Sequence, residues 1–271
     1  MQTIPPDLPS TLEQVIRRDR LAVTLALPAI TLLAWLYLLG MGAGMKSIAM
    51  DAQMHTAMGM ADARVWGISD WLALFAMWAV MMVGMMLPSA VPVILLVLLA
   101  YRRRGDRRAR VSAGAFVTGY VLAWTMFSAL AAGAQVALHR AALLSAGMTS
   151  RSTLLAGAIL LVAGVYQWLP LKNACLTHCQ SPIGFLATHW REGASGALTM
   201  GLRHGAFCVG CCWALMALLF VVGVMNLLWV AAIATFVLLE KLAPQGPPIG
   251  RAAGVLLILW GLFELNRGVT G

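Results

Sequence analysis

The five cysteines of this chain of 271 residues fall into two short clusters, each accompanied by a histidine. Cysteine thiolates bind metal ions and react with other thiols, so these clusters are the strongest sign of chemistry in the sequence. The first cluster consists of Cys175, His178 and Cys179, and the second consists of His204, Cys208, Cys211 and Cys212. We therefore expect metal binding or thiol chemistry at these two places.

The second cluster lies in an apolar segment that is predicted to be a helix. Residues four positions apart fall on nearly the same side of an α-helix, with a slow drift. One face thus collects an imidazole, three thiols and two thioethers, from Met200, His204, Cys208, Cys211, Cys212 and Met216. A single free cysteine often behaves as a small buried hydrophobe. Three of them so close together favour metal binding or thiol chemistry over plain packing.

Two methionine-rich segments add further thioether groups. The first is expected near the middle of the membrane, at a depth similar to that of the second cysteine cluster, and contains Met81, Met82, Met85 and Met86. The second is expected outside the membrane and contains Met54, His55 and Met58. Methionine is also a flexible filler of apolar cores, so packing remains an alternative for the first segment and a plain loop for the second.

The mixture of sulfur donors favours a soft monovalent ion. Burying a net charge in hydrocarbon costs upward of about 2.5 kcal/mol, so a neutral site is preferred. One thiolate with neutral thioethers or an imidazole neutralises an ion of charge +1. Zinc would need two thiolates and has little use for methionine. We therefore expect copper as Cu(I), with zinc as the weaker candidate.

The elements that must position these residues are membrane helices. The chain is 61% hydrophobic and 11% charged, with a mean hydropathy of +0.84, whereas soluble domains carry about a quarter charged residues. We predict an all-α polytopic membrane helix bundle, with a cytoplasmic segment at residues 1–20 and one transmembrane domain at residues 21–271. Seven apolar runs of spanning character are Leu21–Leu39, Asp70–Ala100, Val111–Leu138, Thr153–Leu171, Ala197–Val224, Asn226–Leu242 and Ala252–Leu265.

The net charge of +9 is explained by basic residues that flank the membrane spans, and it does not indicate nucleic-acid binding. Most of the 19 Lys and Arg residues, Lys241 among them, lie in the segments that face one side, with the densest group at 102–110. The positive-inside rule then places the N-terminus in the cytoplasm and the C-terminus outside a bacterial inner membrane. This topology puts the Cys175 cluster in a loop on the inner face, at residues 172–196. We expect Glu240 at the membrane interface, and His189 as an ordinary interface residue.

Three stretches carry a resemblance to a known family. Residues 81–90, 172–182 and 205–216 resemble the bacterial family of uncharacterised, predicted metal-binding integral membrane proteins, and the resemblance extends over about 70–265. The resemblance implies metal binding in a membrane, without a defined activity. The family pattern leads us to expect a basic residue at the position of Gln180.

The leading hypothesis is an inner-membrane protein that binds Cu(I) for transport or delivery. The outer methionines would capture the ion, the transmembrane sulfur atoms would hold it, and Cys175 and Cys179 would exchange it on the inner side. Candidate partners are a soluble metal chaperone or a larger membrane complex. Two alternatives stay open: a thiol–disulfide electron carrier, and a structural or assembly subunit. The chain has no nucleotide-binding or metalloprotease motif, so it is not predicted to be an enzyme.

Overall fold

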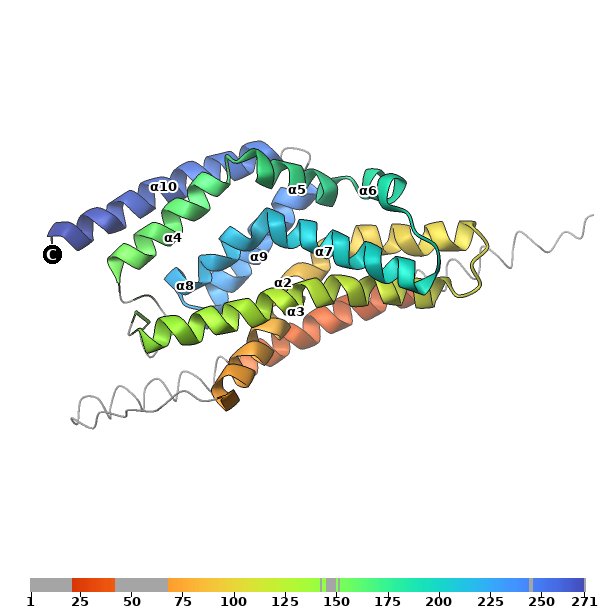
Figure 1. Ribbon diagram of the computed structural model, residues 1–271, viewed down its shortest axis with the longest axis horizontal. Helices are drawn as coiled ribbons and strands as arrows, with labels where there is room; N and C mark the ends of the chain where they lie inside the picture. Colours follow the sequence, from red (N-terminus) through yellow and green to blue (C-terminus); the bar gives the residue numbers. More distant parts are fainter. Residues whose placement is uncertain are drawn as a thin grey trace, which may run out of the picture.

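The protein is a bundle of helices. The computed structural model describes residues 21–41, 68–141, 143–144, 150, 152–243 and 246–270. Within these ranges every regular element is a helix, and a single isolated β-bridge joins Leu144 and Ser150. Most of the helices run along the long axis of the molecule (Figure 1). The predicted all-α fold is confirmed.

Helix lengths decide which elements can cross a membrane. The helices are an N-terminal helix at Leu21–Met41, α2 at Ile68–Arg103, α3 at Ala109–Arg140, α4 at Thr153–Tyr166, α5 at Pro170–Gln180, α6 at Pro182–His189, α7 at Gly193–Ala217, α8 at Leu219–Val222, α9 at Leu227–Leu242 and α10 at Gly246–Thr270. In the described part of the chain, five are long and apolar enough to span a membrane, or six if α4 and α5 form one bent span. The predicted count of seven is not confirmed, because α9 covers only about 24 Å of a hydrocarbon core of about 30 Å.

Helices α3 and α7 form the most intimate helix pair at the centre of the bundle. Gly119 of α3 and Gly201 of α7 lie against the backbone of the opposite helix, so that a Cβ atom at either position would collide with it. An ideal Cβ at Gly205 would lie 2.6 Å from the Cβ of Ala123. Small residues of this kind let helix backbones approach closely in a membrane. The contact fixes the register of α7 against α3.

Helix α2 contains two prolines, and a neighbouring helix satisfies one of the carbonyls that they release. Pro88 has no N–H to donate, which leaves the Gly84 carbonyl without its usual helical partner. The indole Nε1 of Trp35, on the N-terminal helix, donates to the Gly84 carbonyl at 3.3 Å. The freed backbone group is thus paired inside the bundle, as the low polarity of a membrane demands.

Helix α5 turns sharply away from α4 and packs back onto the bundle. The two helices are bent by 64°, and the break precedes Pro170, which starts α5. Leu169 is extended (φ −69°, ψ 138°), as residues before proline prefer to be. The segment predicted to be a loop on the inner face, 172–196, is therefore largely helical and contacts α7 and α9.

A buried ion pair fastens α5 to α9. The Lys172 ammonium group pairs with the Glu240 carboxylate, and each residue is only 1% exposed. Glu240, which we expected at the membrane interface, is buried between helices, where a lysine 68 positions away in sequence neutralises it. Gln180, where a basic residue was expected, donates to the Glu240 carbonyl at 2.9 Å and closes the end of α9.

The turn between α2 and α3 lies at the same end of the molecule as the start of α7. The Tyr101 hydroxyl donates to the Arg191 carbonyl at 2.6 Å. Arg104 stacks on Trp190, with 4.4 Å from its guanidinium carbon to the ring centre, and pairs with Glu192 at 3.7 Å. Helix α6 lies at this end too, and the C-terminus lies at the opposite end (Figure 1). The arginine-rich turn thus marks one face of the bundle.

Candidate metal centre

Sulfur atoms from three helices converge in the interior of the bundle. The Cys179 Sγ of α5 lies 4.0 Å from the Cys211 Sγ of α7. The Cys212 Sγ of α7 lies 4.0 Å from the Met86 Sδ of α2. Cys211, Cys212 and Met86 are at most 1% exposed, and Cys179 is half-buried. The cysteine cluster of 175–179, expected on the inner face, therefore joins the transmembrane cluster in one centre.

The thiols of this centre are free and are held by the backbone. All five cysteines are unpaired, and a disulfide would need a sulfur–sulfur distance of about 2.0 Å. Cys211 and Cys212 both donate to the Cys208 carbonyl, at 3.1 and 2.9 Å. Rotation about a single side-chain bond would release either sulfur toward a ligand. In the described conformation, both thiols are therefore hydrogen-bonded to the backbone of α7 itself.

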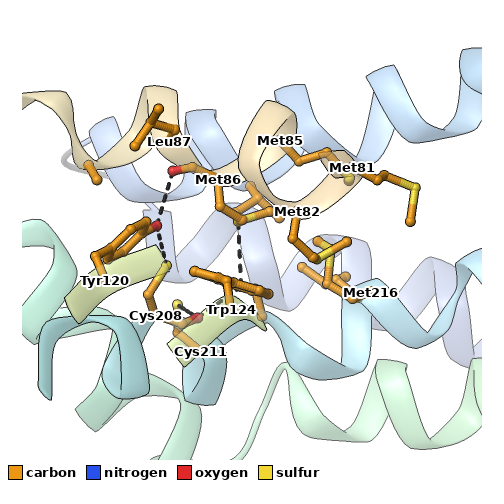
Figure 2. Packing of buried hydrophobic residues seen from close by; sticks show 14 of the residues in the cluster. Met81, Met82, Met85, Met86, Leu87, Tyr120, Trp124, Cys208, Cys211 and Met216 are labelled. Carbon is orange, nitrogen blue, oxygen red and sulfur yellow. Dashed lines mark hydrogen bonds between the residues drawn. The ribbon is translucent and has the colours of Figure 1, made fainter. Parts of the chain in front are cut away.

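Cys208 lies at the most polar point of the centre. Its Sγ is 3.0 Å from the Tyr120 hydroxyl and accepts from the Lys241 ammonium group at 2.9 Å. Lys241 also contacts Ser89 Oγ at 3.3 Å and Met86 Sδ at 3.8 Å. Figure 2 shows Tyr120 joined to both the Met86 carbonyl and the Cys208 sulfur. A buried positive charge thus touches a thiol, a thioether and a hydroxyl.

Sequence reasoning missed Lys241 and Tyr120. Lys241 was counted among the basic residues that flank the spans on the inner side, but it is only 5% exposed. Its place in the sequence gave no signal, because lysines near the end of a membrane helix usually extend to the interface. No signal pointed to Tyr120, since its role depends on the close approach of α3 to α7.

Cys175 lies against a glycine of α7. An ideal Cβ at Gly210 would lie 2.8 Å from the Cys175 Sγ, so the missing side chain makes room for the thiol. The Tyr166 hydroxyl donates to the Gly210 carbonyl and covers the same stretch of α7. Cys175 is half-buried and borders the centre at the side of α5.

The two predicted histidines flank the cysteines. His204 is one helical turn before Cys208, is 3% exposed, and its Nδ1 has no hydrogen-bond partner among the described residues. His178 stacks on Phe207 of α7, with 4.1 Å between the ring centres. Since Cys175, His178 and Cys179 all contact α7, the helical face that they share is the one that packs against it.

The predicted methionines divide into two groups. Met86 contacts the cysteines, whereas Figure 2 shows Met81, Met82 and Met85 further along α2, on the side where Met216 of α7 lies. All of these side chains are at most 2% exposed. The outer group of Met54, His55 and Met58 lies outside the described residues.

The donor set fits a soft ion of low coordination number. Among the described residues, no three His, Cys, Asp or Glu side chains are grouped so that they could hold a metal ion. Two sulfur atoms bound to one ion at about 2.3 Å with a trigonal angle would be about 4.0 Å apart. The Cys179–Cys211 and Cys212–Met86 pairs already have this separation. The centre therefore offers pairs of sulfur ligands, with a thioether among them.

The comparisons with known proteins point in the same direction. A family model described as PpoB2, copper chaperone, matches residues 75–264. The match includes every sulfur atom of the centre. No curated protein and no solved structure matches the chain. The protein belongs to the PpoB2 family of copper chaperones.

Proposed function

We propose that this protein holds Cu(I) in a membrane-embedded sulfur centre and delivers it to an acceptor, in a bacterial inner membrane. One observation carries the proposal: sulfur atoms from α2, α5 and α7 meet in pairs 4.0 Å apart in the buried interior. The paired residues are 32 and 126 positions apart in sequence. Residues so far apart in sequence come together only through the packing of different helices.

The ligand types support Cu(I) over zinc. Structural zinc sites use four ligands from cysteine, histidine and carboxylate side chains. The described residues offer no such group of even three. Thiolate and thioether ligands select Cu(I), and Met86 supplies a thioether within 4.0 Å of Cys212. A site of two or three sulfur atoms suits this ion.

Lys241 changes the charge balance of the site. The charges of Lys172 and Glu240 cancel, so among the described residues the Lys241 ammonium group is the charge beside the cysteines that still needs a partner of opposite sign. Adding Cu(I) brings the total to +2. Two thiolates then make the buried site neutral, where the sequence alone suggested one. We assign one of them to Cys208, beside Lys241, and the other to the Cys179–Cys211 pair.

A thiol–disulfide carrier is the second candidate function. The 4.0 Å separation of Cys179 and Cys211 favours it, since a movement of about 2 Å would bring the sulfur atoms to bonding distance. This function requires no thioether, however. The contribution of Met86 therefore separates the two candidates.

The test is the copper content of protein purified without oxygen. We expect close to one copper ion per chain in the wild type, and loss of that copper in the Cys208/Cys211/Cys212→Ser variant. Met86→Leu removes a thioether from the centre and is expected to weaken Cu(I) binding by about tenfold or more. Met126→Leu removes an exposed thioether of α3, 65% accessible, and is the matched control.

Three results would contradict the proposal. Equal trace copper in the wild type and the triple-serine variant would leave the sulfur atoms with a packing role. A Cys179–Cys211 disulfide in copper-free wild-type protein would favour the electron carrier. Equal affinities of Met86→Leu and Met126→Leu would exclude the thioether from the site.

A further inference from the structure

We infer that His178 and His189 form a second, partly exposed Cu(I) site, through which the ion is exchanged between the aqueous phase and the sulfur centre. This inference rests on the proposed function. The two imidazole rings lie at the ends of α5 and α6, with 5.9 Å between their centres and planes inclined by 72°. His189, expected to be an ordinary interface residue, thus has a histidine partner.

Both rings are oriented by hydrogen bonds that leave the other nitrogen available. His178 Nδ1 lies 2.8 Å from the Ala174 carbonyl, and His189 Nδ1 lies 3.3 Å from the Phe185 carbonyl. His189 Nδ1 also lies 2.8 Å from the Thr188 hydroxyl, which itself donates to the Gly184 carbonyl and so accepts from the ring. A carbonyl oxygen only accepts, so Nδ1 carries the proton in each neutral ring and Nε2 keeps its lone pair. Histidines that bind metals are commonly anchored in this way.

Aromatic stacking fixes the planes of the two rings. His178 stacks on Phe207, with 4.1 Å between centres and planes 9° apart. His189 stacks on Phe185, with 4.9 Å between centres and planes 13° apart. Phe207 directly precedes Cys208 on α7. The same packing that orients the imidazoles therefore connects them to the sulfur centre.

A third histidine, His204, contacts Phe185, the ring on which His189 stacks. His204 is 4.9 Å from Phe185, centre to centre, and one helical turn from Cys208. It is 3% exposed, and its Nδ1 has no hydrogen-bond partner in the part of the chain that the structure describes. A buried nitrogen without a partner is a free ligand position. It lies where an ion passing from the surface pair to Cys208 needs one.

The ligand chemistry gives the path a direction. Cu(I) keeps its oxidation state throughout, because bonds to imidazole nitrogen break as bonds to thiolate sulfur form. Soft thiolates select Cu(I) more strongly than imidazoles do. The ion therefore moves inward from His178 and His189 until the cysteines hold it. Cys179, the neighbour of His178 in sequence, extends its thiol to Cys211 at 4.0 Å.

The test compares the rate of loading with the amount of copper bound. The full-length protein in detergent is mixed without oxygen with Cu(I) in acetonitrile, and ultraviolet absorption of the copper–thiolate bonds is followed over time. We expect His178→Gln/His189→Gln to bind the same amount of copper as the wild type but to load at least about tenfold more slowly. His139→Gln, in the last turn of α3 at the other end of the bundle, is the control.

Each remaining outcome decides the inference. A double variant that loads at the wild-type rate with full copper content would overturn it and leave the proposed function intact. A double variant that binds no copper would place the histidines in the main site and would also overturn it. Wild-type protein without copper would remove the proposed function and this inference together. If the double variant does not fold, the two single variants decide by the same rate.

Discussion

At the residue scale, the contact between Cys208 and Lys241 sets the electrostatics of the centre. The ammonium group lies 2.9 Å from the sulfur, inside the bundle, where a charge needs a partner of opposite sign. In the proposed function, a thiolate at Cys208 provides that partner before any ion arrives. The same lysine then supports a second thiolate once Cu(I) is bound, because the total charge returns to zero.

Removing this charge is expected to weaken copper binding. Lys241→Met leaves no cation to offset a second thiolate, so the site falls back on one thiolate and neutral thioethers. We expect Cu(I) affinity to drop by about tenfold or more, and X-ray absorption to report fewer short copper–sulfur bonds. Lys241→Arg, which keeps the charge, is the control. Tighter binding in Lys241→Met would show that the lysine competes with the ion instead.

The sequence identifies the ligands better than it identifies their supports. Helical spacing is enough to place Cys208, Cys211 and Cys212 on one face, because that face is a local property. The supports are not local. Lys241 and Tyr120 come from α9 and α3, and their contacts with Cys208 exist only after those helices pack.

At the element scale, α5 carries one side of the centre, and a buried ion pair joins it to α9. Lys172 and Glu240 are both 1% exposed, and Gln180 adds a hydrogen bond to the end of α9. Breaking a buried pair leaves one charge without compensation, whereas replacing both partners with apolar residues is often neutral. The pair therefore controls whether α5, with Cys175 and Cys179, stays docked.

This arrangement predicts contrasting effects of single and double substitutions. Lys172→Met is expected to lower the free energy of unfolding by about 3–5 kcal/mol. It should also make Cys179 reactive toward maleimide, since α5 detaches. Lys172→Met/Glu240→Met should recover most of the stability, and thermal unfolding of the purified protein measures both. If the double variant is no more stable than the single one, the ion pair is not what holds α5 against α9.

The bend before α5 illustrates what the sequence could not supply. Pro170 indicates a break in the helix. The segment that follows contains Lys172, so its sequence predicts a loop exposed to water. The partner that permits burial of Lys172 lies in α9, near the end of an apolar run. Only the packing of α5 on α9 reveals that a charged, polar segment returns to the interior.

At the scale of the whole molecule, the donors are arranged in order along α7. Helix α7 starts at the end that carries the arginine-rich turn, and His204, Cys208, Cys212 and Met216 follow one another along it. Figure 2 shows Met82 on the same side of the cysteines as Met216. From His204 onward, imidazole, thiol and thioether groups therefore succeed each other along α7, away from the end with the arginine-rich turn.

The orientation of the bundle can be tested with single cysteines. In protein whose native cysteines are replaced by serine, Arg267→Cys should react with an impermeant maleimide added to intact cells, because the C-terminus is expected outside. Arg104→Cys should react only after the cells are permeabilised. Both native side chains are well exposed, at 61% and 57%. Labelling of both from one side would exclude seven crossings and make α9 a helix that does not span.

The composition of the chain is most informative about its overall topology. The lengths of the helices are less informative about it. The alternation of apolar runs and arginine-rich segments predicted the N-terminal helix, α2, α3 and α9 within a few residues, whereas α5 and α6 were not predicted as helices. The sequence could not give the number of membrane crossings. Helix α9 is shorter than a spanning helix, and α4 and α5 together count as a span only if the bent pair crosses as one unit.

The near-complete burial of the cysteines has a consequence for the cell. Free cuprous ions in water react with oxygen and peroxide and generate damaging radicals. Cys208, Cys211 and Cys212 are each 1% exposed, so an ion among them is shielded from dissolved oxidants as well as from water. If the proposed function holds, the burial of these thiols would keep bound copper apart from the oxidants of the cell.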